Sequence, residues 1–181
     1  MLSNWKILNK YREYDARIFT LFKKEVKSEG LNRTGHFYTL EVVDWINVIA
    51  IDKAGDVILV KQYRHGTEAN SLEVPGGAVD ASDTDPLEAA QRELMEETGY
   101  TSDKWTLLGK VSANPAIMNN FCYCYVAEEC EKTHPTNMDA FEEIEIEKYP
   151  QDKFLNLVRI GEIHHSLAVA ATGLWKLHLE R

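Results

Sequence analysis

The segment comprising residues 76–100 constrains the fold most, because it joins a glycine turn to a helix that has recognisable capping residues at both ends. It reads GGAVDASDTDPLEAAQRELMEETGY. Asp85 is a favourable N-cap residue, and Pro86 suits the first position of a helix. Gly99 stands where a glycine commonly ends a helix in the left-handed conformation. Residues 86–98 are therefore predicted to form a helix that directly follows a glycine turn.

Three glutamates lie on one face of this predicted helix. Glu93, Glu96 and Glu97 have the spacing i, i+3 and i+4, so they project from a single turn and repel one another. A solvated acidic face is the ordinary explanation of such a cluster. Clustered carboxylate oxygens are also what a hard divalent cation requires. The preceding Gly76 and Gly77 favour a cation site, because backbone without Cβ atoms can approach a ligand closely.

Residues 92–100, RELMEETGY, resemble the core RE-U-x-EE-x-G-U of the Nudix box, in which U is an apolar or aromatic residue. Every defined position of that core is matched. The upstream part departs from the family pattern, which has a glycine, five residues, a glutamate and seven residues before Arg-Glu. Here Gly77 is followed by five residues, Asp83 and then eight residues before Arg92. The departure leaves the role of Asp83 open.

The resemblance implies a site for Mg²⁺, which Mn²⁺ can replace. Glu93 and Glu97 would be the main metal ligands, with Glu96 assisting. The main-chain carbonyl of Gly76 would be a further ligand. The number of bound ions stays open.

Catalytic roles also follow from the resemblance. Arg92 would orient a glutamate, and Glu73 would be either the partner of Arg92 or an acid outside the metal's direct ligands. In the branch of the family that acts on ADP-ribose and nucleotide sugars, the general base is often a glutamate on a loop after the box. The acidic segment at residues 139–145 resembles that loop, so Glu142 is the first candidate for the base and Glu143 the second.

Two further segments resemble the same branch and supply candidate substrate-binding residues. Gln62 and Arg64 match its Gln-x-Arg segment, in which the arginine contacts the diphosphate, although an ordinary surface arginine is the alternative. The planar fork of an arginine suits phosphate recognition. Asn114 and Pro115 lie in a loop, with Pro115 sixteen positions after Gly99. A proline near that position is typical of ADP-ribose or nucleotide-sugar hydrolysis in the family.

The rest of the chain indicates a mixed α/β protein in which strands and helices alternate. A sheet with helices on both faces is the expected architecture, and the resemblance implies a Nudix-type α/β/α sandwich with an N-terminal β-strand arm. Residues 63–70 are polar and predicted to form a loop. The remaining helices are expected at residues 151–158 and 165–179, and strands at residues 5–46, 57–60, 72–74, 105–110, 121–127 and 144–148.

We expect residues 1–45 to form the arm and residues 46–181 the Nudix domain. An arm of a few strands is too small to bury a core alone. The resemblance implies a homodimer in which N-terminal strands are exchanged. Aromatic residues such as Trp5, Tyr38 and Trp45 would then belong to the core or the interface, or would stack on a nucleobase.

Composition limits the possible partners. The formal net charge is −9, which argues against long nucleic acids, because their binding depends on Lys and Arg. No apolar run approaches the roughly 20 residues of a membrane helix, and residues 1–6 lack the apolar core of a signal peptide. A cytoplasmic protein is expected. The cysteines number three and are interpreted as buried free thiols rather than a disulfide framework.

The function implied by the resemblance is Mg²⁺-dependent hydrolysis of the diphosphate bond of ADP-ribose or a nucleoside diphosphate sugar. The products would be a nucleoside monophosphate and a sugar phosphate. A second hypothesis is pyrophosphohydrolysis of RNA 5′ ends or nucleoside triphosphates. A third, from another class, is a nucleotide-sugar sensor that binds without turnover. The intact Glu93, Glu96 and Glu97 argue against the sensor.

Overall fold

The computed structural model describes residues 4–138 and 141–180. The chain divides into two compact units, each of which is considered by itself. The first runs to Val43 and includes Ser112–Phe121, and the second contains Asp44–Val111 and continues from Cys122. Residues 112–121 were not expected to join the arm, because nothing in their sequence signals a distant partner.

The first unit is built on an antiparallel sheet of three strands in the order β1-β2-β3. They are β1 (Trp5–Asp15), β2 (Thr20–Ser28) and β3 (Arg33–Glu41). The inserted segment joins the edge at β3, where Leu40 N donates to Ile117 O at 2.7 Å. Every residue of β1 is exposed. The alternating β-formers therefore make strands, as expected, but much of the sheet's apolar surface is left open.

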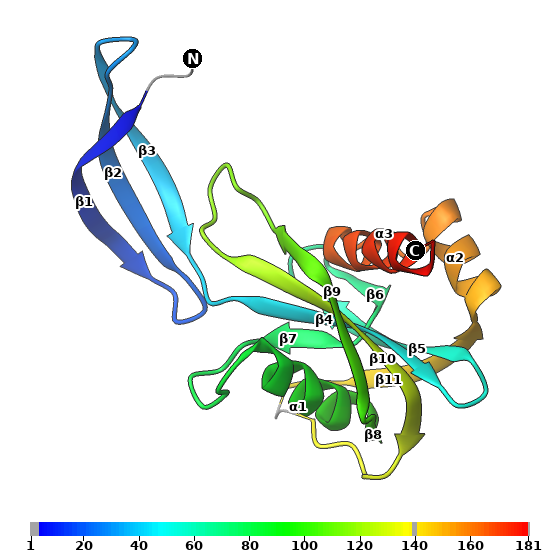
Figure 1. Cartoon of the computed structure of the whole chain (residues 1–181). Coiled ribbons are helices and arrows are strands. Elements are labelled where there is room, and N and C mark those ends of the chain that lie inside the picture. Colours follow the sequence, from blue (N-terminus) through cyan, green and yellow to red (C-terminus); the bar gives the residue numbers. More distant parts are fainter. Residues whose placement is uncertain (1–3, 139–140, 181) are drawn as a thin grey trace. The chain divides into compact units, whose positions relative to one another are not determined.

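The second unit contains an eight-stranded mixed sheet whose main path runs β11-β5-β4-β10-β8, with β6 on β5, β7 on β4 and β9 on β10 (Figure 1). Its central pair, β4 and β10, is parallel. The strands are β4 (Trp45–Asp52), β5 (Asp56–Arg64), β6 (Ala69–Glu73), β7 (Gly76–Ala78), β8 (Tyr100–Thr101), β9 (Lys104–Ser112), β10 (Phe121–Lys132) and β11 (Ile144–Pro150).

Helices cover both faces of this sheet. Figure 1 shows α1 (Pro86–Thr98) on one face and α3 (Ser166–Leu179) on the other, with α2 (Gln151–Ile160) on the side of α3. Strand β4 is buried along almost its whole length, as a strand packed on two sides must be. Leu94 of α1 packs in one core, and Trp175 of α3 packs against Phe154 in the other. The expected mixed sheet between helices is confirmed.

The bounds expected for α1 are confirmed, whereas two other expectations were wrong. Helix α2 continues two residues beyond the expected end to Ile160, where Gly161 with φ 84° terminates it. Residues 63–70 are not simply a loop, since β5 continues to Arg64 and β6 begins at Ala69. The polar composition suggested a loop, but some of these polar side chains belong to a hairpin and contact a buried carboxylate.

The three cysteines are free and buried, as expected. Within the described residues, no helix is both long enough and apolar enough to span a membrane.

Candidate active site

Capping determines where α1 begins and ends, and hence which way its glutamates point. Asp85 Oδ1 accepts hydrogen bonds from the backbone N–H groups of Leu87 at 2.8 Å and Glu88 at 3.0 Å. Gly99 has φ 74° and donates to Met95 O at 2.8 Å. With both ends defined, the helix buries Leu94 in the core and turns the box glutamates toward β7.

The two glycines of β7 allow the strand to lie directly against the helix. Gly76 N–H donates to Glu97 Oε2 at 3.0 Å. A Cβ atom at Gly77 would overlap the Glu93 carboxylate, and a Cβ atom at Gly76 would overlap the backbone carbonyl of Ile46. The glycine turn expected from the sequence is therefore required by close packing on both sides.

Replacing each of the two glycines by alanine is expected to have a different consequence. At Gly77 the obstacle is the end of a flexible side chain, so Gly77→Ala should fold normally but displace Glu93 and lower kcat roughly 100-fold. At Gly76 the obstacle is backbone, so Gly76→Ala should lower the free energy of unfolding by about 1–3 kcal/mol. Urea unfolding and steady-state kinetics measure both. Gly66→Ala, which has open space around it, is the control, and full activity of Gly77→Ala would contradict the prediction.

Burial and mutual repulsion raise the pKa values of two of the glutamates. Burial raises the pKa of Glu93 to about 6, against the opposing effect of Arg92. Burial raises the pKa of Glu97 to about 8, although the hydrogen bond from Gly76 opposes it. Glu93 adds to the shift at Glu97, and Glu142 adds to both. Ionising this cluster is therefore costly unless positive charge is supplied.

The donor chemistry fits a hard divalent cation. Carboxylate oxygens on one helical turn are suitable ligands, and a cation would offset the raised pKa values of Glu93 and Glu97. In the described parts of the chain, no three acidic, His or Cys side chains converge as a ready-made metal cluster. Arg92 Nη1 instead binds Glu93 Oε1 at 2.9 Å and Glu96 Oε2 at 3.0 Å.

The pKa of Glu97 predicts how the stability of the metal-free protein depends on pH. The folded value of about 8 exceeds the ordinary value of 4.5, so the contribution of this group is fully present below pH 4.5 and is lost as pH rises through 8. Glu97→Gln should therefore become progressively more stable than the wild type over that window, by up to a few kcal/mol. Urea midpoints in EDTA measure the difference, and parallel pH profiles would contradict it.

Asp83, whose role the departure from the family pattern had left open, forms an ion pair with Arg92. Its Oδ1 and Oδ2 accept from Arg92 Nε at 3.1 Å and Nη2 at 3.0 Å, and its side chain is 4% exposed. Arg92 Nη2 also donates to Ala78 O at 3.1 Å. A shorter acid on a loop one residue longer thus forms a bidentate pair that positions Arg92. Of the two roles left open for Glu73, pairing with Arg92 was therefore wrong.

Glu73 pairs with Arg64 instead, because β5 and β6 are adjacent in the sheet. Arg64 Nε donates to Glu73 Oε1 at 2.9 Å, and Nη2 donates to Oε2 at 2.7 Å. His165 Nδ1 lies 3.1 Å from the same Oε2. Gln62 is two residues before Arg64 on β5 and half-buried, so it lies on the same face of that strand.

The two candidate bases precede β11, and both are exposed. Of the acidic segment, Asp139 and Ala140 lie outside the described residues. Glu142 is near enough to Glu93 and Glu97 to raise the pKa of each. It also contributes to the raised pKa of Arg64, after the larger effect of Glu73. Glu142, and not Glu143, is among the main electrostatic influences on these groups, so the electrostatics favour Glu142.

The candidate substrate residues of the loop lie in the first unit. Asn114 and Pro115 are exposed, and Asn114 O accepts hydrogen bonds from the backbone N–H groups of Ile117 and Met118. Their part in substrate binding stays a prediction.

The family model for the NUDIX domain matches residues 41–166. This chain belongs to the NUDIX family. It is 30% identical over 163 residues to the ADP-ribose pyrophosphatase of Bacillus subtilis, covering 88% of this chain and 85% of that protein. It is 29% identical over 161 residues to the ADP-ribose pyrophosphatase of Mycobacterium tuberculosis, covering 87% and 76%. A crystal structure of an ADP compounds hydrolase shares the fold, with a TM-score of 0.86, 23% identity and coverage of 99% and 96%.

Membership of the NUDIX family confirms the resemblance seen in residues 92–100 and identifies the enzyme class. Sequence reasoning missed His165 in this Nudix site, because no local pattern connects it to Glu73. The role of Asp83 had been left open. The ion-pairing role of Asp83 could have been suspected from its position in the box, but the longer loop concealed it.

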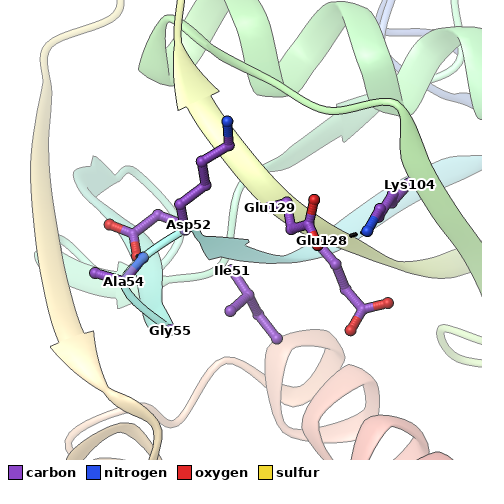
Figure 2. A pocket seen from close by; sticks show the side chains of 8 residues that line it. Ile51, Asp52, Ala54, Gly55, Lys104, Glu128 and Glu129 are labelled. Carbon is purple, nitrogen blue, oxygen red and sulfur yellow. Dashed lines mark hydrogen bonds and ion pairs between the residues drawn. The ribbon is translucent and has the colours of Figure 1, made fainter.

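A hollow elsewhere in the second unit is not this Nudix site. It has a volume of about 290 Å³ and is lined by residues that include Asp52, Lys104 and Glu129. Figure 2 shows Lys104 reaching toward Glu129 there. Asp52 is the last residue of β4, whereas Asn47, near the other end of that strand, pairs with Gly76. The box glutamates and the hollow therefore lie near opposite ends of β4.

Proposed function

We propose that this Nudix enzyme hydrolyses the diphosphate bond of ADP-ribose or a nucleoside diphosphate sugar. The observation that carries the proposal is the proximity of a fixed guanidinium to the box acids. Glu73 holds Arg64 by two hydrogen bonds, and Glu97 and Glu142 both act electrostatically on Arg64. The names of the relatives from Bacillus subtilis and Mycobacterium tuberculosis support this substrate class.

Glu93 and Glu97 would hold Mg²⁺ or Mn²⁺, with Glu96 and the carbonyl of Gly76 as additional ligands. When bound, the ion supplies positive charge to the diphosphate and lowers the pKa of a bound water. The adjacent Arg92 keeps Glu93 and Glu96 in place through Nη1. The raised pKa values of Glu93 and Glu97 support this assignment.

Side chains of the protein bind the substrate and accept the proton of the attacking water. Arg64 binds a phosphate group, because its pairing with Glu73 fixes the plane of the guanidinium. Glu142 accepts the proton of the attacking water, since a carboxylate near the acidic cluster can act as a general base. Gln62, Asn114 and Pro115 contribute to substrate binding. Cleavage gives a nucleoside monophosphate and a sugar phosphate.

A substrate panel tests the proposal and its rivals together. ADP-ribose, a GDP sugar, a UDP sugar, ATP and triphosphorylated RNA are compared with Mg²⁺ and with Mn²⁺. We expect the highest kcat/KM for ADP-ribose or one of the sugars, with AMP and ribose 5-phosphate as the products from ADP-ribose. Faster turnover of ATP or RNA would favour the triphosphate hypothesis. Tight binding of ADP-ribose without turnover would favour a sensor.

We also propose that the protein is a homodimer through its N-terminal strands. Trp5 and Ile7 on β1 are 55% and 60% exposed, and exposed apolar groups of this kind mark interaction surfaces. Light scattering should give about twice the chain mass of 20.7 kDa. Replacing Trp5 and Ile7 by Lys should give monomers, whereas Glu13→Lys on the same strand should not. A wild-type mass of one chain at every concentration would contradict the proposal.

A further inference from the structure

The structure assigns a positioning role to His165, which acts on Arg64 through Glu73. This inference rests on the proposed function, because Arg64 is there the group that binds phosphate. His165 is not a ligand of the substrate in this account. It determines where the guanidinium of Arg64 can lie.

The side chain of His165 is committed to Glu73 rather than to its own helix. His165 is the N-cap residue of α3, but it makes no side-chain capping hydrogen bond. Its Nδ1 lies 3.1 Å from Glu73 Oε2. The helix begins in the C-terminal part of the chain, so this contact connects α3 to the end of β6.

Both oxygens of Glu73 are engaged. Oε1 accepts from Arg64 Nε, while Oε2 accepts from Arg64 Nη2 and from His165 Nδ1. The Glu73 side chain is 3% exposed, and a buried carboxylate is stable only when its hydrogen-bonding capacity is used. Burial would raise the pKa of Glu73, but the hydrogen bonds from His165 and Arg64 outweigh it and lower the pKa well below its ordinary value. Glu73 is therefore a fixed anion.

The arrangement leaves one end of Arg64 available. A bidentate pair fixes the guanidinium plane, and the third bond from His165 prevents Glu73 from rotating with its partner. Arg64 is 42% exposed in its side chain. Its Nη1 donates no hydrogen bond to any residue that the structure describes. Removing His165 would leave the ion pair intact but free to turn, which would weaken the contact between Nη1 and a phosphate.

The kinetic experiment compares His165→Ala with His165→Asn, His165→Gln and the control His164→Ala. His164 is the exposed neighbour. With ADP-ribose and Mg²⁺, we expect His165→Ala to raise KM roughly tenfold with a smaller change in kcat, the size of one hydrogen bond to a charged group. The Asn amide nitrogen occupies the position of the imidazole Nδ1, so Asn should restore KM and Gln should not.

A double-mutant cycle separates positioning from a general effect on α3. In an Arg64→Ala background, His165→Ala should change KM less than twofold, because the group that it positions is gone. The inference is overturned if His165→Ala changes KM no more than His164→Ala does. It is also overturned if the separate effects of His165→Ala and Arg64→Ala on KM multiply fully in the double variant.

A second readout does not depend on turnover. In ¹⁵N-labelled protein, the Nε–H resonance of Arg64, assigned by its loss in Arg64→Lys, should be sharp in the wild type and in His164→Ala. It should broaden or shift in His165→Ala and recover in His165→Asn. An unchanged resonance in His165→Ala would overturn the inference. If the wild type hydrolysed neither ADP-ribose nor any nucleoside diphosphate sugar of the panel, the proposed function alone would be refuted, and the resonance would still decide the role of His165.

Discussion

Glu97→Gln is expected to lower kcat by about 1000-fold, which corresponds to roughly 4 kcal/mol of lost transition-state stabilisation. Glu97 is 3% exposed and accepts the hydrogen bond from Gly76 N–H, so glutamine fits the same space. The amide nevertheless lacks the charge that a divalent cation requires. The variant should fold, and in EDTA above pH 4.5 it should be more stable than the wild type.

Glu88→Gln is the matched control for Glu97→Gln. It makes the same chemical change on the same helix, but Glu88 is exposed near the beginning of α1, where it accepts from Thr84 N–H at 2.6 Å. We expect less than a twofold change in kcat for the control. If the kcat of Glu97→Gln lies within about tenfold of the wild-type value, Glu97 is not part of the catalytic site.

Glu142→Gln is expected to lower kcat about 100- to 10,000-fold, the range for loss of a general base. Its neighbour supplies the comparison, since Glu143→Gln should change kcat less than threefold. The difference is expected because Glu142 is among the main electrostatic influences on the pKa values of Glu93, Glu97 and Arg64, and Glu143 is not.

The kinetic parameters distinguish a general base from a group that only shapes the loop. Loss of the base should lower kcat with little change in KM or in the affinity for a divalent cation. If Glu143→Gln is the inactive variant, the second candidate replaces the first. If both variants remain active, the base lies outside this segment.

The sequence predicted α1 well because its determinants are local. Asp85, Pro86 and Gly99 act on the backbone within a few residues, and they define the bounds that the structure shows. The box glutamates were found for the same reason, since the i, i+3 and i+4 spacing places them on one face of any helix. The glycines were expected to let the backbone approach a ligand closely, whereas the direct packing of Gly77 against Glu93 is seen only in the structure.

What sequence reasoning missed depends on pairing between distant segments. Arg64 and Glu73 meet because β5 and β6 form a hairpin, and polar residues 63–70 gave no sign of a strand. His165 reaches Glu73 across 92 positions of the chain, through packing that no periodicity records. Residues 112–121 belong with the first unit because of pairing at β3, which their composition does not reveal.

Diffraction from crystals soaked in Mn²⁺, recorded to detect the anomalous signal, tests most directly whether the box acids hold the cation that hydrolysis needs. We expect a peak bound by the carboxylates of Glu93 and Glu97 in the wild type, and its loss or marked weakening in Glu97→Gln. A peak at another place, or a wild-type enzyme that turns over ADP-ribose while these two carboxylates bind no ion, would contradict the account.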